Sequence, residues 1–340
     1  MLAFDIQAEG HVAGALLPRT GIFRVLVCRT SHSLGNTLFM TPLLQEIDAL
    51  WPGAEVDLVT RYASARHIFA SYASIREVLV LPKQLLRHPL QWLKLLWRLR
   101  RDRYDLVIDT DLRSRTGRAL LRLARGRHKL GFAGRGGLSA AVEAAQAPKH
   151  AAHFPVYLLR RALGITGHDY APLSTRLTSS ERARGRARLA HVAGPQARGK
   201  RGIIGVFANA TGPKAMSEQW WADFMREAEP RLSEYTIVEI VPAFGRSMLG
   251  ERYPAYYSSD IRNLSKFLSA LSMLICLDCG IMHLARASGT PVGAVFTTTD
   301  AEIWGPYGPG ACVAHGDREN PRQAAQHLLD KLPLHASVAA

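Results

Sequence analysis

Short apolar runs, many of them rich in Val, Ile and Leu, alternate with longer helical patterns from residue 22 onward. Continuous apolar runs are typical of strands that are buried on both faces of a parallel sheet. In the first half we expect strands at 23–29, 55–60, 77–82 and 105–109, and helices at about 35–50, 61–71, 88–101 and 114–125. This alternation predicts an open, doubly wound α/β sheet.

The same alternation restarts near residue 202. Strands are expected at 202–208, 235–241, 273–278 and 291–297, with helices over Trp220–Glu229 and 263–272. A chain of 340 residues also fits two domains. We therefore predict two Rossmann-like domains that face each other across a cleft, which is the default ligand site in such proteins.

The boundary between the domains is expected in a basic stretch. SERARGRARLAHVAGPQARGKRG (180–202) begins as a basic helix and ends in Gly, Pro and Lys, a composition that suits a connection. The predicted divisions are a flexible leader at 1–21, a first Rossmann-like domain at 22–178, a connecting segment at 179–202 and a second Rossmann-like domain at 203–340.

The net charge of +15 favours an anionic partner such as nucleic acid, anionic lipid or phosphorylated glycan. Arginines are spread along the chain without a zinc-finger, RNP or homeodomain pattern, so we expect no nucleic-acid partner. The chain has no run of 18 apolar residues and no signal-peptide pattern, which predicts a cytoplasmic protein. Four unevenly spaced cysteines, too few for a disulfide framework, agree with a reducing compartment: Cys28, Cys276, Cys279 and Cys312.

The most informative motif is MLICLDCGIMHLARASGTPVGAVF (273–296). A strand ends at Asp278, a turn contains Gly280, and the following helix ends at the Gly-Thr-Pro of 289–291. Free N–H groups and the helix dipole favour an anion at such a helix start. The strand, the glycine turn and the helix start therefore predict an anion site, where Asp278 can accept a hydrogen bond from a ribose or sugar hydroxyl and His283 can donate to a phosphate oxygen.

Two other interpretations of this motif are open. Cys276 and Cys279 form a C-x-x-C pair, but zinc normally needs four ligands and no second close Cys/His pair has the usual spacing. Cys276 also falls inside the apolar strand, where cysteine is commonly a small hydrophobic residue. His283 can equally be a packed helix residue.

LDCGIMHLARASGTPVGAVFTTTDAEIWGPYG (277–308) resembles the signature of glycosyltransferase family 9, the lipopolysaccharide heptosyltransferases. The matching residues are Asp278, Gly280, His283, Leu284, Ala285, Gly289, Thr290, Pro291, Phe296, Thr299, Asp300, Trp304 and Pro306. Cys279 stands where the family usually has Ser or Thr, and Thr297 where it usually has Gly. The resemblance implies a GT-B fold and a donor-binding loop made of Asp278, Cys279, Gly280, Ile281, Met282 and His283.

Other segments resemble the same family. They are RVLVCRTSHSLGNTLFMTP (24–42), the segment 104–132, and FANATGPKAMSEQWWADFM (207–225), in which a family lysine precedes a tryptophan. The resemblance implies that Lys214 neutralises the departing nucleotide diphosphate, with Asn209 and Thr211 lining the same site. The alternative is an exposed loop lysine. On the acceptor side we expect Ser33, Gly35, Arg113 and Arg115.

One departure from the family concerns the general base. The family has a Gly-Asp pair where this chain has Gly35 and Asn36, and a carboxamide cannot take a proton at physiological pH. Candidate replacements are Asp109, Asp111 and His32. Otherwise the chain is a weakly active or non-catalytic nucleotide- or glycan-binding relative.

The resemblance implies inverting, metal-independent transfer of a sugar, with heptose from ADP-heptose as the first guess, to a lipopolysaccharide-type or other bacterial surface glycan. The nucleotide sugar is a co-substrate, and no cofactor or metal is expected. The Asp-Thr-Asp of 109–111 does imitate the D-x-D motif that holds Mg²⁺ or Mn²⁺ in another glycosyltransferase architecture.

A basic and aromatic stretch, KQLLRHPLQWLKLLWRLRRDRY, occupies residues 83–104. Basic residues interleaved with Trp and Leu suit a helix at an anionic membrane surface or one that holds a phosphorylated lipid acceptor. A peripheral location on the inner face of the cytoplasmic membrane is a further expectation from this pattern. The alternative is a core-packed helix with a solvated basic edge.

Overall fold

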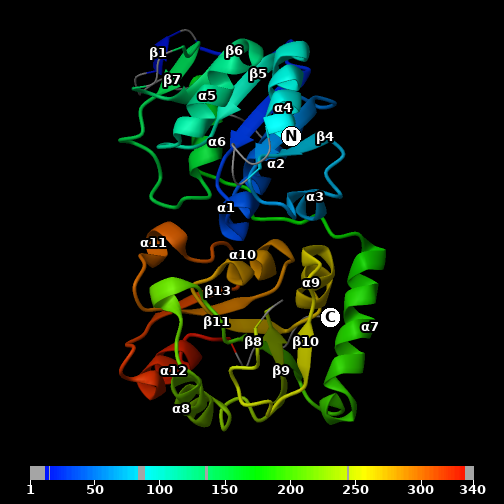
Figure 1. Ribbon diagram of the computed structural model, residues 1–340. Helices are drawn as coiled ribbons and strands as arrows, with labels where there is room; N and C mark the ends of the chain where they lie inside the picture. The colour runs from blue at the N-terminus through cyan, green and yellow to red at the C-terminus, as the bar shows by residue number, and fades with distance from the viewer. Residues whose placement is uncertain (1–11, 15, 83–88, 135–136, 243–244, 334–340) are drawn as a thin grey trace. The chain divides into compact units, whose positions relative to one another are not determined.

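The computed structural model describes residues 12–14, 16–82, 89–134, 137–242 and 245–333. The chain divides into two compact units, Met1–Ala171 and Pro172–Ala340. Each unit is built on one sheet of mainly parallel strands with helices between them (Figure 1). The predicted architecture of two doubly wound α/β domains is confirmed.

The first unit contains a seven-stranded sheet in the order β1-β7-β6-β5-β2-β3-β4. All neighbouring strands are parallel except β1, which pairs antiparallel with β7. The strands are β1 (Val12–Gly14), β2 (Arg24–Arg29), β3 (Glu55–Thr60), β4 (Ile75–Val80), β5 (Arg103–Asp109), β6 (Arg125–Phe132) and β7 (Ala140–Val142). The helices are α1 (Leu34–Leu38), α2 (Thr41–Leu50), α3 (Ala65–Ile68), α4 (Pro89–Arg101), α5 (Arg115–Leu123) and α6 (Phe154–Ala162).

All four strands expected in this half are present, and the expected helices differ in length. The helix expected at 35–50 is two helices, because Pro42 lacks the N–H that a continuous helix would need and is instead accommodated in the first turn of α2. The helix expected at 61–71 is reduced to α3, Ala65–Ile68. Of the basic stretch at 83–104, residues 83–88 lie outside the described residues and the rest forms α4 and the start of β5.

Residues 16–21, which we predicted as part of a flexible leader, are anchored to the first unit. Leu17 is buried, and its N–H donates to the carbonyl of Ala162 at 2.8 Å. The indole N–H of Trp51 donates to the carbonyl of Arg19 at 2.9 Å. An apolar contact and two hydrogen bonds therefore fix this segment, which its composition alone did not indicate.

The second unit contains a six-stranded, fully parallel sheet in the order β10-β9-β8-β11-β12-β13. The strands are β8 (Gly202–Phe207), β9 (Tyr235–Val241), β10 (Ala255–Tyr257), β11 (Met273–Leu277), β12 (Val292–Phe296) and β13 (Ala311–His315). The α-helices are α7 (Ser179–Ala193), α8 (Glu218–Ala228), α9 (Ile261–Leu268), α10 (Gly280–Ala287), α11 (Ala301–Trp304) and α12 (Pro321–Leu329). Short 3₁₀ turns cover Pro195–Ala197 and Gly212–Lys214.

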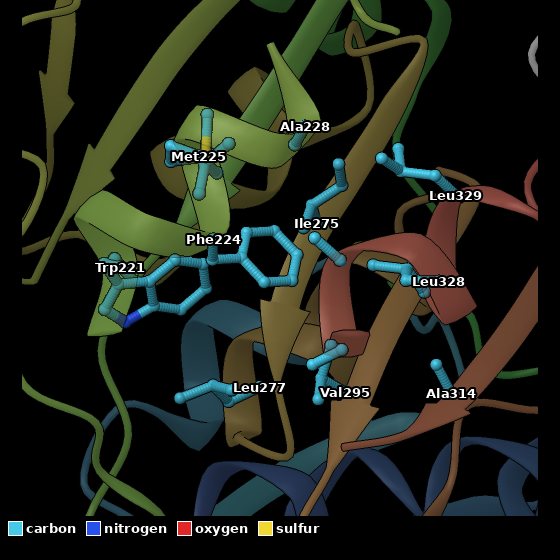
Figure 2. Packing of buried hydrophobic residues seen from close by; sticks show 14 of the residues in the cluster. Trp221, Phe224, Met225, Ala228, Ile275, Leu277, Val295, Ala314, Leu328 and Leu329 are labelled. Carbon is cyan, nitrogen blue, oxygen red and sulfur yellow. The ribbon is translucent and has the colours of Figure 1, made fainter. Parts of the chain in front are cut away.

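An aromatic cluster on α8 forms part of the core of the second unit (Figure 2). Trp221 and Phe224 lie three residues apart and are fully buried, and their rings meet edge to face with centroids 5.3 Å apart. This face of α8 packs toward Ile275 of β11 and toward Leu328 of α12. Because helices cover the strands on both sides, β11 is apolar along its whole length.

Helix α7, which we predicted within a connecting segment, packs on α9 inside the second unit. A capping box between Thr178 and Glu181 starts the helix, and Glu181 also accepts hydrogen bonds from the guanidinium of Arg262 at 2.6 and 2.8 Å. These bonds from Arg262 lower the pKa of Glu181 to about 2. The division between the units at Ala171 accordingly precedes the predicted boundary at 178.

Gly185 allows α7 and α9 to approach closely. A Cβ at this position would lie 1.9 Å from the carbonyl oxygen of Lys266, which is backbone and cannot move aside cheaply.

Among the helices that the structure describes, none is long and apolar enough to cross a membrane.

We therefore predict that Gly185→Ala destabilises the protein by about 1–3 kcal/mol, because the added methyl group overpacks the contact with α9. Helix propensity alone predicts the opposite sign, a gain of about 1 kcal/mol. Urea unfolding followed by circular dichroism measures the difference. Arg186→Ala, at an exposed position on the same helix, is the control and should change stability by less than about 0.5 kcal/mol. A Gly185→Ala protein as stable as the wild type would contradict the close approach.

Candidate functional site

Three side chains from neighbouring strands meet at one edge of the second sheet. The ammonium of Lys214, which follows β8, lies 3.1 Å from a carboxylate oxygen of Asp278, which follows β11. The hydroxyl of Thr299, which follows β12, donates to the same oxygen. β8, β11 and β12 are adjacent and parallel, so their carboxyl ends lie side by side. Asp278 is buried and links the three loops.

Helix α10 begins directly beside Asp278. Its N-cap residue is Cys279, whose backbone is extended and whose side chain does not cap the helix. The first N–H groups of α10, those of Gly280 and Ile281, have no acceptor within the helix. Both residues are partly exposed, so the helix start can accept an anion from solvent.

The next two residues of the predicted donor loop point inward. Met282 is fully buried and His283 is 4% exposed. The packed position that we considered for His283 is therefore its observed one. The backbone N–H groups before it are the more accessible donors.

The two cysteines of the C-x-x-C pair interact with each other. Burial raises the pKa of the Cys276 thiol, and the neighbouring Cys279 raises it further. Burial would also raise the pKa of Cys279, but Cys276 and the N–H groups of Met282 and Ile281 outweigh it and leave the value lowered. Among the described residues, no group of three or more His, Cys, Asp and Glu side chains is arranged to hold a metal ion.

The loop after β8 carries the other predicted donor residues. The amide nitrogen of Asn209 is buried without a hydrogen-bond partner among the described residues. Thr211 is exposed and precedes the 3₁₀ turn Gly212–Lys214, which brings Lys214 to Asp278. A buried N–H group without an acceptor is rare in native proteins, so Asn209 is suited to donate to a ligand.

A cavity of about 550 Å³ lies farther along the same edge of the sheet, after β12 and β13. Thr297, His315, Arg318 and His327 are among its lining residues, whereas Lys214 and Asp278 are not. The ion pair between Lys214 and Asp278 therefore does not line this cavity.

In the first unit, Arg29 joins the predicted base position to Asp111. Its guanidinium donates to the amide oxygen of Asn36 at 2.8 Å and lies 3.2 Å from the Asp111 carboxylate. Arg29 ends β2 and Asp111 follows β5, and these strands are parallel neighbours. Burial lowers the pKa of Arg29, and the carboxylates of Asp111 and Asp109 partly offset this. The guanidinium still stays protonated at neutral pH.

The other base candidates have different surroundings. Asp111 accepts hydrogen bonds from the N–H and the hydroxyl of Thr30, both at 2.8 Å, and its side chain is 14% exposed. Asp109 is fully buried, and a Cβ at Gly117 would lie only 2.5 Å from its carboxylate. His32 is exposed. A base must reach its substrate, so burial disfavours Asp109 and leaves Asp111 and His32.

The predicted acceptor residues surround this group. Ser33 caps α1 by accepting a hydrogen bond from the N–H of Asn36 at 3.3 Å. Gly35 is buried in the first turn of α1, and Arg113 and Arg115 are exposed in the segment after Asp111. The structure thus brings Ser33, Gly35 and Asn36 together at the start of α1, and leaves the two arginines open to solvent.

Three residues with clear partners were not among the predicted site residues: Arg29, Thr30 and Thr299. Thr299 did belong to the family signature, and this was the available signal. Arg29 and Thr30 directly follow a predicted strand core, where polar residues at the carboxyl end of a parallel strand are candidates for a site.

We predict that Arg29→Met destabilises the first unit by about 3 kcal/mol, because it leaves the partly buried Asp111 carboxylate without its ion pair. Urea unfolding measures the change. The control is Arg113→Met, which removes an exposed arginine from a nearby segment and should cost less than about 0.5 kcal/mol. Equal stability of the two variants would show that the Arg29 ion pair contributes nothing to the fold.

The model of glycosyltransferase family 9 (heptosyltransferase) matches residues 259–332, which include Asp278, the start of α10 and Thr299. A search of the curated proteins finds no match.

Several solved structures share the fold. A family 9 glycosyl transferase from Veillonella parvula superposes with a TM-score of 0.74 at 17% identity, covering 92% of this chain and 99% of that one. ADP-heptose lps heptosyltransferase II of E. coli has a TM-score of 0.65 at 17% identity, covering 90% and 98%. E. coli heptosyltransferase WaaC, solved with ADP, has a TM-score of 0.63 at 20% identity, covering 92% and 96%.

These similarities extend over nearly the whole length of each chain, so the GT-B fold is confirmed. The family match covers the segment that carries the donor-loop motif. The family match over this segment and the shared fold both agree with the predicted resemblance to glycosyltransferase family 9.

Proposed function

We propose that the chain is an inverting, metal-independent glycosyltransferase. In this proposal it moves a sugar from a nucleotide sugar, with ADP-heptose as the first candidate, to a lipopolysaccharide-type or other bacterial surface glycan. The observation that carries the proposal is the group of Lys214, Asp278 and Thr299 beside the N-terminus of α10. A cytoplasmic location, where nucleotide sugars are available, belongs to the same proposal.

On the donor side, the leaving group is a nucleoside diphosphate whose negative charge grows as the glycosidic bond breaks. The ammonium of Lys214 and the N–H groups of Gly280 and Ile281 would stabilise this charge. Asp278 acts as a positioning residue, because it holds Lys214 at 3.1 Å and is itself held by Thr299. WaaC, which shares the fold, was solved with ADP, and this supports an ADP-linked donor.

On the acceptor side, inversion requires a single displacement by an acceptor hydroxyl, and one base must take its proton. We assign this role to Asp111, whose carboxylate is partly exposed and paired with Arg29. Asn36 would orient the hydroxyl. Its amide oxygen is held by Arg29, and its amide nitrogen donates to the hydroxyl of Ser31 at 3.0 Å.

The donor assignment predicts selective stabilisation by ADP or ADP-linked sugars over GDP, UDP and dTDP ligands in a thermal-shift screen. Lys214→Ala should weaken ADP binding by about 10- to 100-fold, because it removes one charge-assisted contact with the diphosphate. Lys200→Ala is the matched control. Lys200 precedes β8, at the opposite end of the strand from Lys214, and donates to the carbonyl of Ser233.

If GDP, UDP or dTDP ligands stabilise the protein instead of ADP, that nucleotide replaces ADP in the proposal and the donor site is unchanged. Equal ADP affinity in Lys214→Ala and Lys200→Ala would contradict the donor site itself. Isothermal titration gives the affinities, and the melting temperature without ligand shows whether each variant is folded.

A second candidate function is binding of a nucleotide or glycan without transfer. Asn36 favours this reading, because a neutral amide occupies the base position and its oxygen is already bonded to Arg29. In that case Arg29 and Asp111 would form a structural ion pair and Asp111 would not take part in chemistry.

Transfer assays with ADP-heptose and a truncated lipopolysaccharide acceptor separate the two functions. We expect the wild type to transfer, and Asp111→Asn to lower kcat by about 10²- to 10⁴-fold, because the amide keeps the bonds from Thr30 but cannot take a proton. His32→Gln is the comparison for the other accessible base and should keep most of the activity. If the wild type binds ADP and is inert while Asn36→Asp transfers, the non-catalytic function is correct for the natural chain.

A further inference from the structure

Helix α4 of the first unit carries an exposed apolar stripe. Leu90, Leu93 and Trp97 have exposed fractions of 78%, 61% and 57%. They are spaced three and four residues apart, so they lie along one face of the helix. Large apolar side chains grouped on one exposed face usually mark an interaction site.

The stripe is not the face that packs on the core. Leu95 and Leu99 belong to the buried core of the first unit, with exposed fractions of 7% and 0%. On a helix of 3.6 residues per turn, these two positions lie on the side opposite to Leu90 and Trp97. The core-packed interpretation of the sequence therefore explains the inner face of α4 and leaves the outer apolar face unexplained.

Positive charge accompanies the stripe. Lys94 and Arg101 each follow a stripe residue by four positions, and both are exposed on the outer side of the helix. The guanidinium of Arg101 lies 4.9 Å from the centre of the Trp97 ring. The helix contains no acidic residue, and Arg98 pairs with Glu77 of β4.

The elements next to α4 add further basic groups. α4 contacts α5 and β6 (Figure 1), and Arg122, Arg125 and Arg127 of these elements are exposed. The outer face of α4 is thus a strip of hydrocarbon bordered by cations. In a membrane interface the apolar part enters the boundary of headgroups and acyl chains, while the cations meet lipid phosphates.

We infer that the outer face of α4 docks on the surface of an anionic phospholipid bilayer. Leu90, Leu93 and Trp97 enter the interface, and Lys94 and Arg101 lie at the level of the lipid phosphates. A bilayer fits better than a nucleic acid, because leucine side chains offer no stacking or hydrogen bond to a base. This inference goes beyond the proposed function, since it uses no residue of the donor site or of the base group.

Helix α7 shows that positive charge alone does not produce this pattern. It is also rich in arginine, with Arg184 and Arg186 exposed, but none of the large apolar residues that are strongly exposed in the described parts of the chain belongs to it. The two helices therefore provide matched surfaces, one cationic and apolar and one cationic alone.

The test is co-sedimentation of the full chain with phosphatidylcholine vesicles that contain or lack phosphatidylglycerol. The wild type should bind the anionic vesicles and bind pure phosphatidylcholine far more weakly. Leu93→Gln with Trp97→Gln should lower the partition coefficient by at least about tenfold, because burial of both side chains in the interface is lost. Lys94→Gln with Arg101→Gln should lower it by about tenfold or more at low salt and reduce its salt dependence.

The control pair is Arg184→Gln with Arg186→Gln, which removes the same charge from α7 and should leave the partition within about twofold of the wild type. A second control, Tyr257→Gln, removes an exposed apolar residue from β10 in the second unit and should also have little effect. Melting temperatures confirm folding, and ADP affinity should be unchanged in every variant. Loss of vesicle binding would therefore leave the proposed donor site unaffected, and loss of ADP binding would leave the proposed membrane contact unaffected.

Three results would overturn the inference. They are absence of wild-type binding to anionic vesicles, unchanged binding of the Leu93 and Trp97 variant, and equal loss of binding in the α4 and α7 charge variants. The last result would indicate attraction by net charge alone. Duplex DNA that binds with the same dependence on Lys94 and Arg101, and displaces the protein from vesicles, would assign the surface to nucleic acid instead.

Discussion

Parallel pairing of β8, β11 and β12 is the constraint on which the candidate donor site depends. Their registers bring the loops after Phe207, Leu277 and Phe296 to one edge of the sheet, although these residues are far apart in the sequence. The Asp278 carboxylate then links the loops through Lys214 and Thr299. Apolar cover on both faces fixes this edge, because β11 and β12 are fully buried and cannot slip in register without exposing their side chains.

The same arrangement occurs in the first unit, where β2 and β5 end side by side. Arg29 is the shared partner there, as Asp278 is in the second unit, but with the opposite charge. Each unit therefore holds a central charged group that is satisfied by residues from neighbouring strand ends. The first unit thus has a central cation beside Asn36, and the second a central carboxylate beside the start of α10.

Periodicity predicted the buried strands well, because an apolar run that must be covered on both faces leaves few alternatives. The strands at 55–60 and 235–241 have the expected bounds. Strand β6 was missed because RGRHKLGF is half basic and has no continuous apolar run. The motif around Asp278 and Gly280 was readable from sequence, and Thr299 belonged to the family signature. The contact between Thr299 and Asp278 was not readable, because it depends on the pairing of β11 with β12. On α4 the sequence indicated a basic helix with several apolar positions, but it did not show which of them are buried. Packing in the first unit buries Leu95 and Leu99 and leaves the other apolar face exposed.

Asn36 connects the stability of the first unit with its chemistry. One buried guanidinium, that of Arg29, serves both the Asn36 amide and the Asp111 carboxylate. A carboxylate at position 36 would compete with Asp111 for this charge, and two carboxylates around one cation repel each other unless one takes up a proton. With a neutral amide at position 36, the ion pair with Arg29 is left to Asp111. The base role that we propose for Asp111 therefore goes together with the amide at position 36.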